Sequence, residues 1–243
     1  MNSLKWVRSW VLAACLSAGC DSATSSSGAD TGDTLGGDAS ACAPVHIITA
    51  RGASEAAGEG RTAALVDQIV SSSHQSITRA ALDYPATISS YATNSAEGVI
   101  ALKLELATQA QNCPNQHLVL VGYGEGGQVI LDTLGGGGGG TLGAVTAPIA
   151  PAVVDHVFAV VTFGDPRHTT KQAYDLGTAL QDGMYPRTDA QLQVLNTYAS
   201  KIEAFCDADD IYCASGTSLQ VAVTYLTRYQ TPAATFVLSK IGD

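Results

Sequence analysis

Basic residues are scarce in this chain, and charged residues of either sign are few. The 243 residues include 12 Lys and Arg against 22 Asp and Glu, which gives a formal net charge of −10 and a charged fraction of 14%. No basic cluster interrupts this acidic composition. Because nucleic acids bind largely through phosphate contacts to Lys and Arg, the composition argues against a nucleic-acid partner.

Metal-binding patterns are missing as well. No Cys and His residues stand at the spacing of a zinc site, and the adjacent acids Asp209 and Asp210 lack partner ligands. The five histidines occur singly, and a lone histidine at a strand edge or in a loop is usually structural or solvated. We therefore expect no metal and no other cofactor.

The N-terminal apolar stretch is too short to span a bilayer. Lys5 and Arg8 precede it, and it runs only from Val11 to Gly19, which is the arrangement of a signal peptide. We predict a signal peptide over residues 1–20 and an exported protein.

Residues Ser17–Cys20 resemble a bacterial lipobox, in which the cysteine is acylated and becomes the new N-terminus. This resemblance predicts a lipoprotein-type signal peptide and an anchor at the cell envelope through Cys20. Two alternatives stay open. One is ordinary signal cleavage nearby, which would leave a secreted protein, and the other is a competing lipobox at Leu12–Cys15.

Residues 21–41 consist mainly of Ser, Gly, Asp, Thr and Ala and have almost nothing to bury. Such a composition predicts a flexible tether. Residues 42–243 are long enough for one domain with a substantial core, and they contain no internal repeat.

Strand-like and helix-like segments alternate along residues 42–243, which is typical of a parallel sheet with helices on both faces. The predicted strands are Val45–Ala50, Ile77–Leu82, His117–Gly122, Val157–Phe163 and Ile202–Phe205. The predicted helices are Arg61–Ser72, Ser95–Gln111, Gly126–Leu134, Leu219–Tyr229 and Ala233–Ile241. Asn94 and Glu97 resemble a capping box at the start of the second helix. No bulky lid insertion is evident, so we expect a shallow, open cleft.

A serine is missing from the segment where it would be most informative. Gly122–Gly127 reads Gly-Tyr-Gly-Glu-Gly-Gly, the frame of the G-x-S-x-G nucleophile elbow, with Gly124 where the serine would stand. Moving the frame by one would place Glu125 at the apex, but Tyr123 would then occupy a position that needs a small residue. A generic Gly-rich turn or a phosphate loop is the alternative, although the G-K-[ST] ending of a P-loop is absent.

Other motifs follow in a set order around this frame. They are Ala50-Arg51-Gly52, Cys113-Pro114, Gly164-Asp165-Pro166, Phe205–Cys213 and Val221–Tyr225. Together with the elbow frame, over about residues 42 to 243, they resemble the cutinase and acetylxylan esterase family of secreted serine esterases. The resemblance implies an α/β-hydrolase fold of cutinase type, a three-layer sandwich with a central parallel five-stranded sheet.

The resemblance also implies a degenerate catalytic site. The nucleophile position falls at Gly124 and the acid at Asp210, whereas the histidine falls at Ala222, where the family usually reads Val-His-x-x-Tyr. The oxyanion hole would use the backbone N–H of Glu125 and the residue at Ala53, which is apolar here. Without a base to accept the serine proton an alkoxide does not form near neutral pH, so the retained acid has nothing to orient.

Four cysteines remain in the domain, and arithmetic alone allows three pairings. The family resemblance implies Cys42–Cys113 and Cys206–Cys213. Both bonds would be reasonable in an exported protein.

Three functions are compatible with these residues. The first is an exported cutinase-like protein that no longer hydrolyses esters and binds an ester-bearing polymer, a polysaccharide or a small ester. The second is a working carboxylic ester hydrolase that uses residues such as Ser54, His168 and Glu125. The third is a surface lipoprotein that keeps the fold for stability alone. We expect a monomer whose only membrane contact is the lipid anchor.

Overall fold

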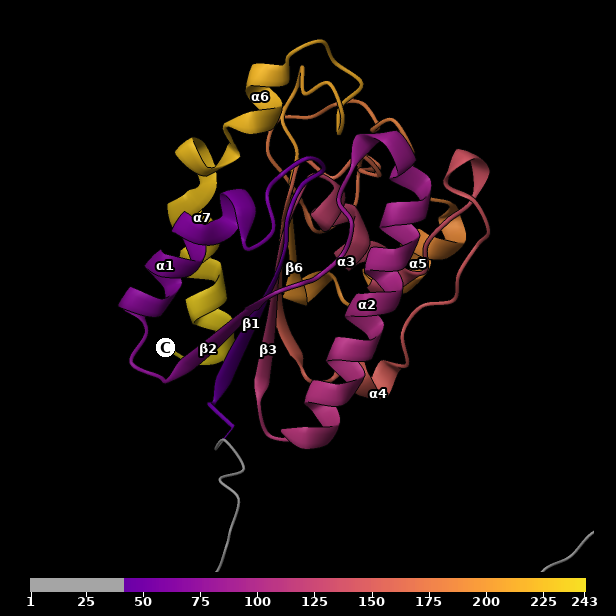
Figure 1. Cartoon of the computed structure of the whole chain (residues 1–243). Coiled ribbons are helices and arrows are strands. Elements are labelled where there is room, and N and C mark those ends of the chain that lie inside the picture. The colour runs from indigo at the N-terminus through magenta and orange to yellow at the C-terminus, as the bar shows by residue number, and fades with distance from the viewer. Residues whose placement is uncertain (1–41) are drawn as a thin grey trace, which may run out of the picture. The chain divides into compact units, whose positions relative to one another are not determined.

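The computed structural model describes residues 42–243 (Figure 1). The predicted signal peptide, its Cys20 and the tether of residues 21–41 lie outside this range. Within residues 42–243, no helix combines the length and the apolar character that a membrane crossing requires.

A six-stranded parallel sheet forms the centre of the domain, in the order β2-β1-β3-β4-β6-β5. Its strands are β1 (Val45–Ala50), β2 (Ile77–Ala81), β3 (His117–Tyr123), β4 (Val157–Phe163), β5 (Asp175–Leu176) and β6 (Ile202–Phe205). The predicted α/β architecture and its five strands are confirmed. The sixth strand, β5, has only two residues, which is too short to produce a periodic pattern in the sequence.

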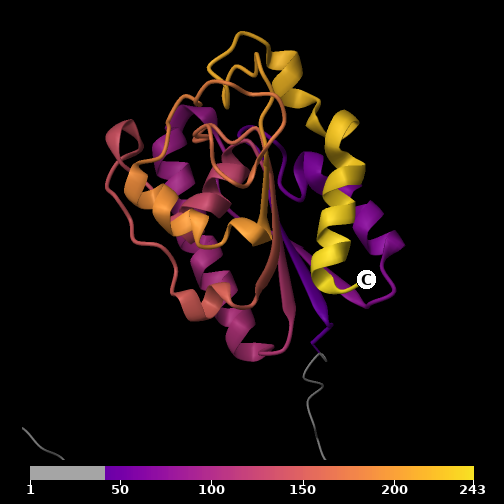
Figure 2. The same ribbon diagram turned by 180° about the vertical axis from the view of Figure 1, so that it is seen from behind.

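Helices cover both faces of the sheet (Figures 1 and 2). They are α1 (Ala63–Ser72), α2 (Tyr91–Asn112), α3 (Glu125–Gly135), α4 (Pro151–Val154), α5 (Asp189–Asn196), α6 (Leu219–Val223) and α7 (Tyr225–Ile241). Helices α1 and α7 pack together over one apolar core, and α2 and α3 pack together over the other. The near-continuous apolar sequences of β1, β3 and β4 follow from this, because both of their faces are buried.

The capping prediction at Asn94 is wrong. Helix α2 begins at Tyr91, directly after a 3₁₀ turn at Ile88–Ser90, so Asn94 lies inside the helix. Its side chain is buried and donates a hydrogen bond to the carbonyl of Thr87, 2.7 Å away. A capping box does occur in α5, where Thr188 is the cap and Gln191 completes it.

The two predicted helices over 219–229 and 233–241 are also corrected. The break lies at Thr224, whose backbone leaves helical geometry with φ −123° and ψ 21°, and α7 then continues without interruption from Tyr225 to Ile241, with Pro232 inside it. Two short helices, α4 and α5, are absent from the sequence prediction.

Both predicted disulfides are confirmed. Cys42–Cys113 links the start of the described domain to the end of α2, and Cys206–Cys213 closes the loop after β6. Their Cα–Cα distances, 5.7 and 5.9 Å, lie in the usual range for disulfides.

A long segment between β4 and α5, residues 164–188, is held down by buried ion pairs. Arg187 contacts Asp132 of α3 at 2.9 Å and Asp165 at 2.5 Å, and Arg167 contacts Asp132 at 2.8 Å. All four side chains are nearly inaccessible to solvent. Because removing one member of a buried ion pair leaves an uncompensated charge, this cluster fixes the segment against α3.

Candidate functional site

The turn from β3 into α3 has the backbone of a strained elbow. Gly124 lies at its apex with φ 52° and ψ −116°, a conformation that L-residues rarely adopt. Its N–H donates to the carbonyl of Phe163 at 2.8 Å. A Cβ built on Gly124 would find Gly52 Cα as its nearest neighbour, 3.9 Å away. There is therefore room for a side chain at this position, and the obstacle to one is backbone strain.

Two neighbouring glycines allow the elbow to lie in close contact with the sheet, because they have no side chain. A Cβ on Gly122 would lie 2.7 Å from the backbone of Gly126, and a Cβ on Gly126 would collide with the carbonyl of Ala50. Helix α3 thus starts in direct backbone contact with β1 and β3. This packing depends on the residues around the apex and requires no side chain at Gly124.

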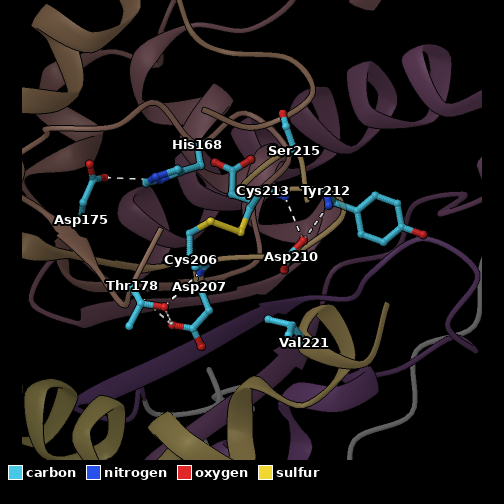
Figure 3. Close-up of a disulfide and its surroundings, with 12 residues drawn as sticks. His168, Asp175, Thr178, Cys206, Asp207, Asp210, Tyr212, Cys213, Ser215 and Val221 are labelled. Atoms are coloured by element: carbon cyan, nitrogen blue, oxygen red, sulfur yellow. Dashed lines mark hydrogen bonds and ion pairs between the residues drawn. A yellow bond between two sulfur atoms is a disulfide. The ribbon is translucent and has the colours of Figure 1, made fainter. Parts of the chain in front are cut away.

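The expected acid, Asp210, lies in the loop closed by the second disulfide (Figure 3). Its side chain has no solvent exposure, 0%. One carboxylate oxygen accepts from the N–H groups of Tyr212 and Cys213 at 2.7 and 3.0 Å, and the other accepts from the Tyr225 hydroxyl at 2.7 Å. Both oxygens of Asp210 are therefore hydrogen-bonded without any histidine.

The expected base position, Ala222, lies on α6 and is 6% exposed. Its carbonyl accepts a hydrogen bond from the Tyr123 hydroxyl at 2.8 Å, which connects the base position to the elbow. The acid also lies near α6, because Asp210 forms an isolated β-bridge with Ser218, the N-cap residue of that helix. The structure thus brings the regions of residues 124, 210 and 222 together at the carboxyl edge of the sheet, where ligands of α/β folds bind.

The expected oxyanion positions lie on the two segments that flank the apex. Glu125 is the first residue of α3, and the N–H groups of a first helical turn have no partner within the helix. Ala53 follows β1 in a turn in which the N–H of Glu55 donates to the carbonyl of Gly52. The buried Arg51 fixes this turn, since its guanidinium donates to the carbonyls of Glu55, Leu82 and Tyr84. The adjacent Ser54 is exposed, with φ 65°.

The side chain of Glu125 is an unusual feature of the site that the sequence interpretation missed. The residue is 2% exposed, and neither carboxylate oxygen has a hydrogen-bond partner among residues 42–243. Burial raises the pKa of this carboxyl to about 8, with partial opposition from the charge of Arg51. The group is therefore largely neutral at pH 7. The sequence did contain one signal for this feature: an acidic residue between two glycines, directly after an apolar strand.

His168 is buried beside Asp175 of β5. It is 6% exposed, and Figure 3 shows its ring directed toward Asp175, with Nδ1 3.6 Å from the nearer carboxylate oxygen. Burial holds the pKa of this imidazole below its usual range. A role for His168 as a general base would require it to leave this position.

An open groove of about 190 Å³ lies beside the base position. Its lining comprises Arg61, Tyr123, Val223, Thr224, Leu226 and Thr227. Arg61 forms one wall, where it pairs with Glu55 at 2.9 Å and donates to the carbonyl of Val223 at 3.3 Å. The groove offers apolar side chains and hydroxyls next to the elbow. It agrees with the expectation of a shallow, open site.

The described residues contain no metal-binding cluster: within 42–243, no group of three or more His, Cys, Asp or Glu side chains is arranged to hold an ion. The elbow and Glu125 supply backbone donors and a neutral carboxyl. The expected nucleophile and base positions carry no reactive side chain. This arrangement supplies no attacking group at the apex.

Comparison with known proteins gives one consistent result. The sequence model of the Cutinase family matches residues 41–241. Acetylxylan esterase 2 of Talaromyces purpureogenus is 29% identical over 210 residues, which cover 83% of this chain and 88% of that protein. Cutinase 11 of Verticillium dahliae is 30% identical over 211 residues, covering 83% of this chain and 70% of the relative.

Solved structures agree with the sequence relatives. An acetylxylan esterase structure at 0.90 Å resolution superposes with a TM-score of 0.75 at 30% identity, covering 83% of this chain and all of that one. A cutinase-like protein from Cryptococcus sp. shares the fold with a TM-score of 0.64 at 22% identity, over 84% of this chain and 97% of its own.

Proposed function

Since the chain belongs to the cutinase family of α/β-hydrolases, we propose that it is a cutinase-fold protein that binds an ester-bearing ligand and hydrolyses it little or not at all. One observation carries the proposal. Gly124 stands at the apex of an otherwise complete elbow, with φ 52° and ψ −116°. The base position of the same site is the buried methyl group of Ala222.

The missing groups act as a unit in a serine esterase. The hydroxyl attacks only when a base removes its proton, and the acid only orients that base. Without nucleophile and base, an oxyanion hole and binding alone provide about 10³–10⁴-fold acceleration over water. Asp210 adds nothing to this chemistry while there is no histidine for it to orient, although its Oδ2, which accepts only from Tyr225, could accept one more hydrogen bond.

The ligand class follows from the family and from the site. Relatives are named acetylxylan esterase and cutinase, so an acetylated polysaccharide, a polyester or a small ester is the ligand we propose. The groove at Tyr123 and Val223 offers apolar contacts next to the elbow. The neutral carboxyl of Glu125 lets a carbonyl oxygen approach the start of α3 without charge repulsion.

A working ester hydrolase is the second candidate. The observation that favours it is Ser54, an exposed hydroxyl held at a positive φ of 65° beside the expected oxyanion residue Ala53. A serine at this position would need a base. His168, the histidine considered for that role, has its ring buried beside Asp175.

Three measurements on the purified protein distinguish these functions. We expect hydrolysis of p-nitrophenyl acetate little faster than in buffer, and no labelling by a fluorophosphonate probe, which needs an activated nucleophile. We also expect retention of the protein on acetylated xylan or on a polyester film, with an unrelated acidic protein as the control. Stoichiometric labelling that disappears in Ser54→Ala would establish the second candidate instead. Failure to be retained on any ester-bearing material would leave neither binding nor catalysis at this site.

We further propose export, with acylation at Cys20 as the anchor. Support comes from the charged start and short apolar stretch of the leader and from the two disulfides of the domain, since disulfides persist in oxidising compartments. Mass spectrometry of the mature N-terminus should find a diacylglyceryl cysteine at residue 20. An unmodified terminus beyond residue 20 would remove the anchor and keep export.

A further inference from the structure

A small, partly open cavity lies behind the acid loop, between β4, the segment 164–188 and β6. Its volume is about 10 Å³. Apolar walls come from residues such as Leu131, Tyr174 and Phe205, and the polar lining includes Thr162, His168, Asp175 and Arg187. None of these four polar residues belongs to the elbow or to the base position described above.

Each of the four residues brings an unsatisfied polar atom. Thr162 Oγ1, His168 Nε2, Asp175 Oδ1 and Arg187 Nε are buried and have no hydrogen-bond partner within residues 42–243. These are half of the eight buried side-chain atoms in that state. Buried polar groups are nearly always paired with protein or ordered water, and the four residues that carry these atoms all line the same cavity.

We propose that this cavity is a binding site for one internal water molecule, held by Thr162, His168, Asp175 and Arg187. The volume is about that needed for a single water, and three or four polar partners are typical for a buried water. Arg187 Nε–H can only donate, and Asp175 Oδ1 accepts when it is ionised. A water molecule, with two hydrogens and two lone pairs, matches such a mixed lining.

Other occupants of this size fit the donors and acceptors less well. A metal ion or an ammonium ion has no lone pair for Arg187 Nε–H and would lie beside the guanidinium charge. A halide or another anion would lie against the carboxylate of Asp175. The neutral imidazole of His168, whose pKa is lowered by burial, accepts through Nε2 when Nδ1 carries the proton toward Asp175, 3.6 Å away.

The site has a structural consequence that is independent of ester binding. Its partners come from β4, from the start of the segment 164–188, from β5 and from the end of that segment. One water molecule therefore cross-links both ends of the segment to the sheet, beside the Asp132–Arg187 ion pair. It also occupies His168 Nε2, the atom that the esterase alternative would need as its base.

The substitution Thr162→Val tests the proposal by the sign of its effect. If water is bound, valine removes one of its partners, and the melting temperature should fall by about 2–4 °C, the shift expected for the loss of one buried hydrogen bond in a domain of this size. If no water is bound, the threonine hydroxyl is an unpaired buried group, and valine should leave the melting temperature unchanged or raise it. Thr133→Val is the matched control, because the buried Thr133 hydroxyl donates to the Val129 carbonyl within its own helix.

A direct observation keeps the proposal testable if the variant fails to fold. A high-resolution crystal structure of the wild-type protein should show one density peak within hydrogen-bond distance of at least three of the four atoms, and Thr162→Ser, which keeps the hydroxyl, should retain it. No peak in the cavity, or a peak with the scattering of a metal or halide, would overturn the assignment.

Discussion

The elbow around Gly124 and the loop around Asp210 belong to one catalytic design, yet different interactions hold them. At the elbow, backbone contacts of Gly122 and Gly126 with their neighbours set the position of α3, and the apex has room for a side chain but does not need one. In the acid loop, the carboxylate of Asp210 itself is the structural element, because two backbone N–H groups and the Tyr225 hydroxyl bind it.

This difference separates what activity requires from what the fold requires. Removing a serine from the apex relieves strain and breaks no contact, whereas removing Asp210 would leave several buried donors unpaired. The presence of the acid is therefore explained by folding alone. It is no evidence for hydrolysis, and the five predictions below test this contrast.

The largest expected effect comes from rebuilding the missing chemistry. Gly124→Ser with Ala222→His should raise p-nitrophenyl acetate hydrolysis by about 10³-fold over the wild type, because nucleophile and base act as a unit. Either substitution alone should do little. Equal activity in Gly124→Ser alone would mean that another histidine, His168 first, already serves as the base. A folded but inactive double variant would show that the triad has been placed wrongly.

The two disulfides should contribute unequally to stability. Cys42–Cys113 joins residues 71 apart, for which loop entropy predicts about 4 kcal/mol, whereas Cys206–Cys213 joins residues 7 apart and predicts about 2–3 kcal/mol. Urea unfolding of the two double Cys→Ala variants measures both values. If the variant without Cys206–Cys213 lost more unfolding free energy than the variant without Cys42–Cys113, the acid loop would depend more on its disulfide than on the hydrogen bonds of Asp210.

Removal of one hydroxyl should show that Asp210 is structural. Tyr225→Phe deletes the donor to Asp210 and the acceptor of the Asp207 N–H, and it should cost about 2–3 kcal/mol of unfolding free energy. Tyr212→Phe, in the same loop but with an exposed ring, should change the unfolding free energy by less than about 0.5 kcal/mol. Similar values for the two variants would contradict the account of the acid loop.

A methyl group at the apex should reveal strain without crowding. Gly124→Ala should lower the free energy of unfolding by about 1–2 kcal/mol. Alanine tolerates φ 52° and ψ −116° poorly, although no neighbouring atom would clash with its methyl group. Gly143→Ala is the matched control, since Gly143 has φ 83° in open space on a surface loop and should show a comparable penalty. A stabilised Gly124→Ala would mean that the apex does not have the elbow conformation.

The smallest expected effect is a pH dependence from Glu125. Its pKa is raised to about 8, so on folding the group stays neutral while the unfolded chain ionises. Stability from this group is therefore fully present below about pH 4, decreases as the pH rises and levels off above about pH 8. Glu125→Gln should flatten this decrease. At pH 9 it should raise the free energy of unfolding by about 1 kcal/mol or more, as measured by urea unfolding. Glu97→Gln, on the exposed face of α2, should leave the profile unchanged.

The sequence predictions were most accurate where a single local pattern decides the structure. Val45–Ala50, Val157–Phe163 and Ile202–Phe205 form the strands with the predicted bounds, because each is an apolar run with clear ends. Asn94 was misassigned, since capping chemistry is local but the 3₁₀ turn before it extends the helix backwards. The buried carboxyl of Glu125 was also missed, because its surroundings include side chains far along the chain, such as Tyr84 and Tyr91, whose pKa values its charge raises.

The sequence by itself determined the family, the parallel sheet and the absence of serine and histidine at residues 124 and 222, and the family resemblance implied the two disulfides. Each of these depends on residue identity and order. Only the tertiary structure decided that both oxygens of Asp210 are hydrogen-bonded without a base, that Glu125 is buried and neutral, and that four residues with unpaired buried polar atoms line one cavity. Hydrogen bonds, burial and pKa depend on which distant residues meet in space, and the linear pattern carries that information only after the chain has folded.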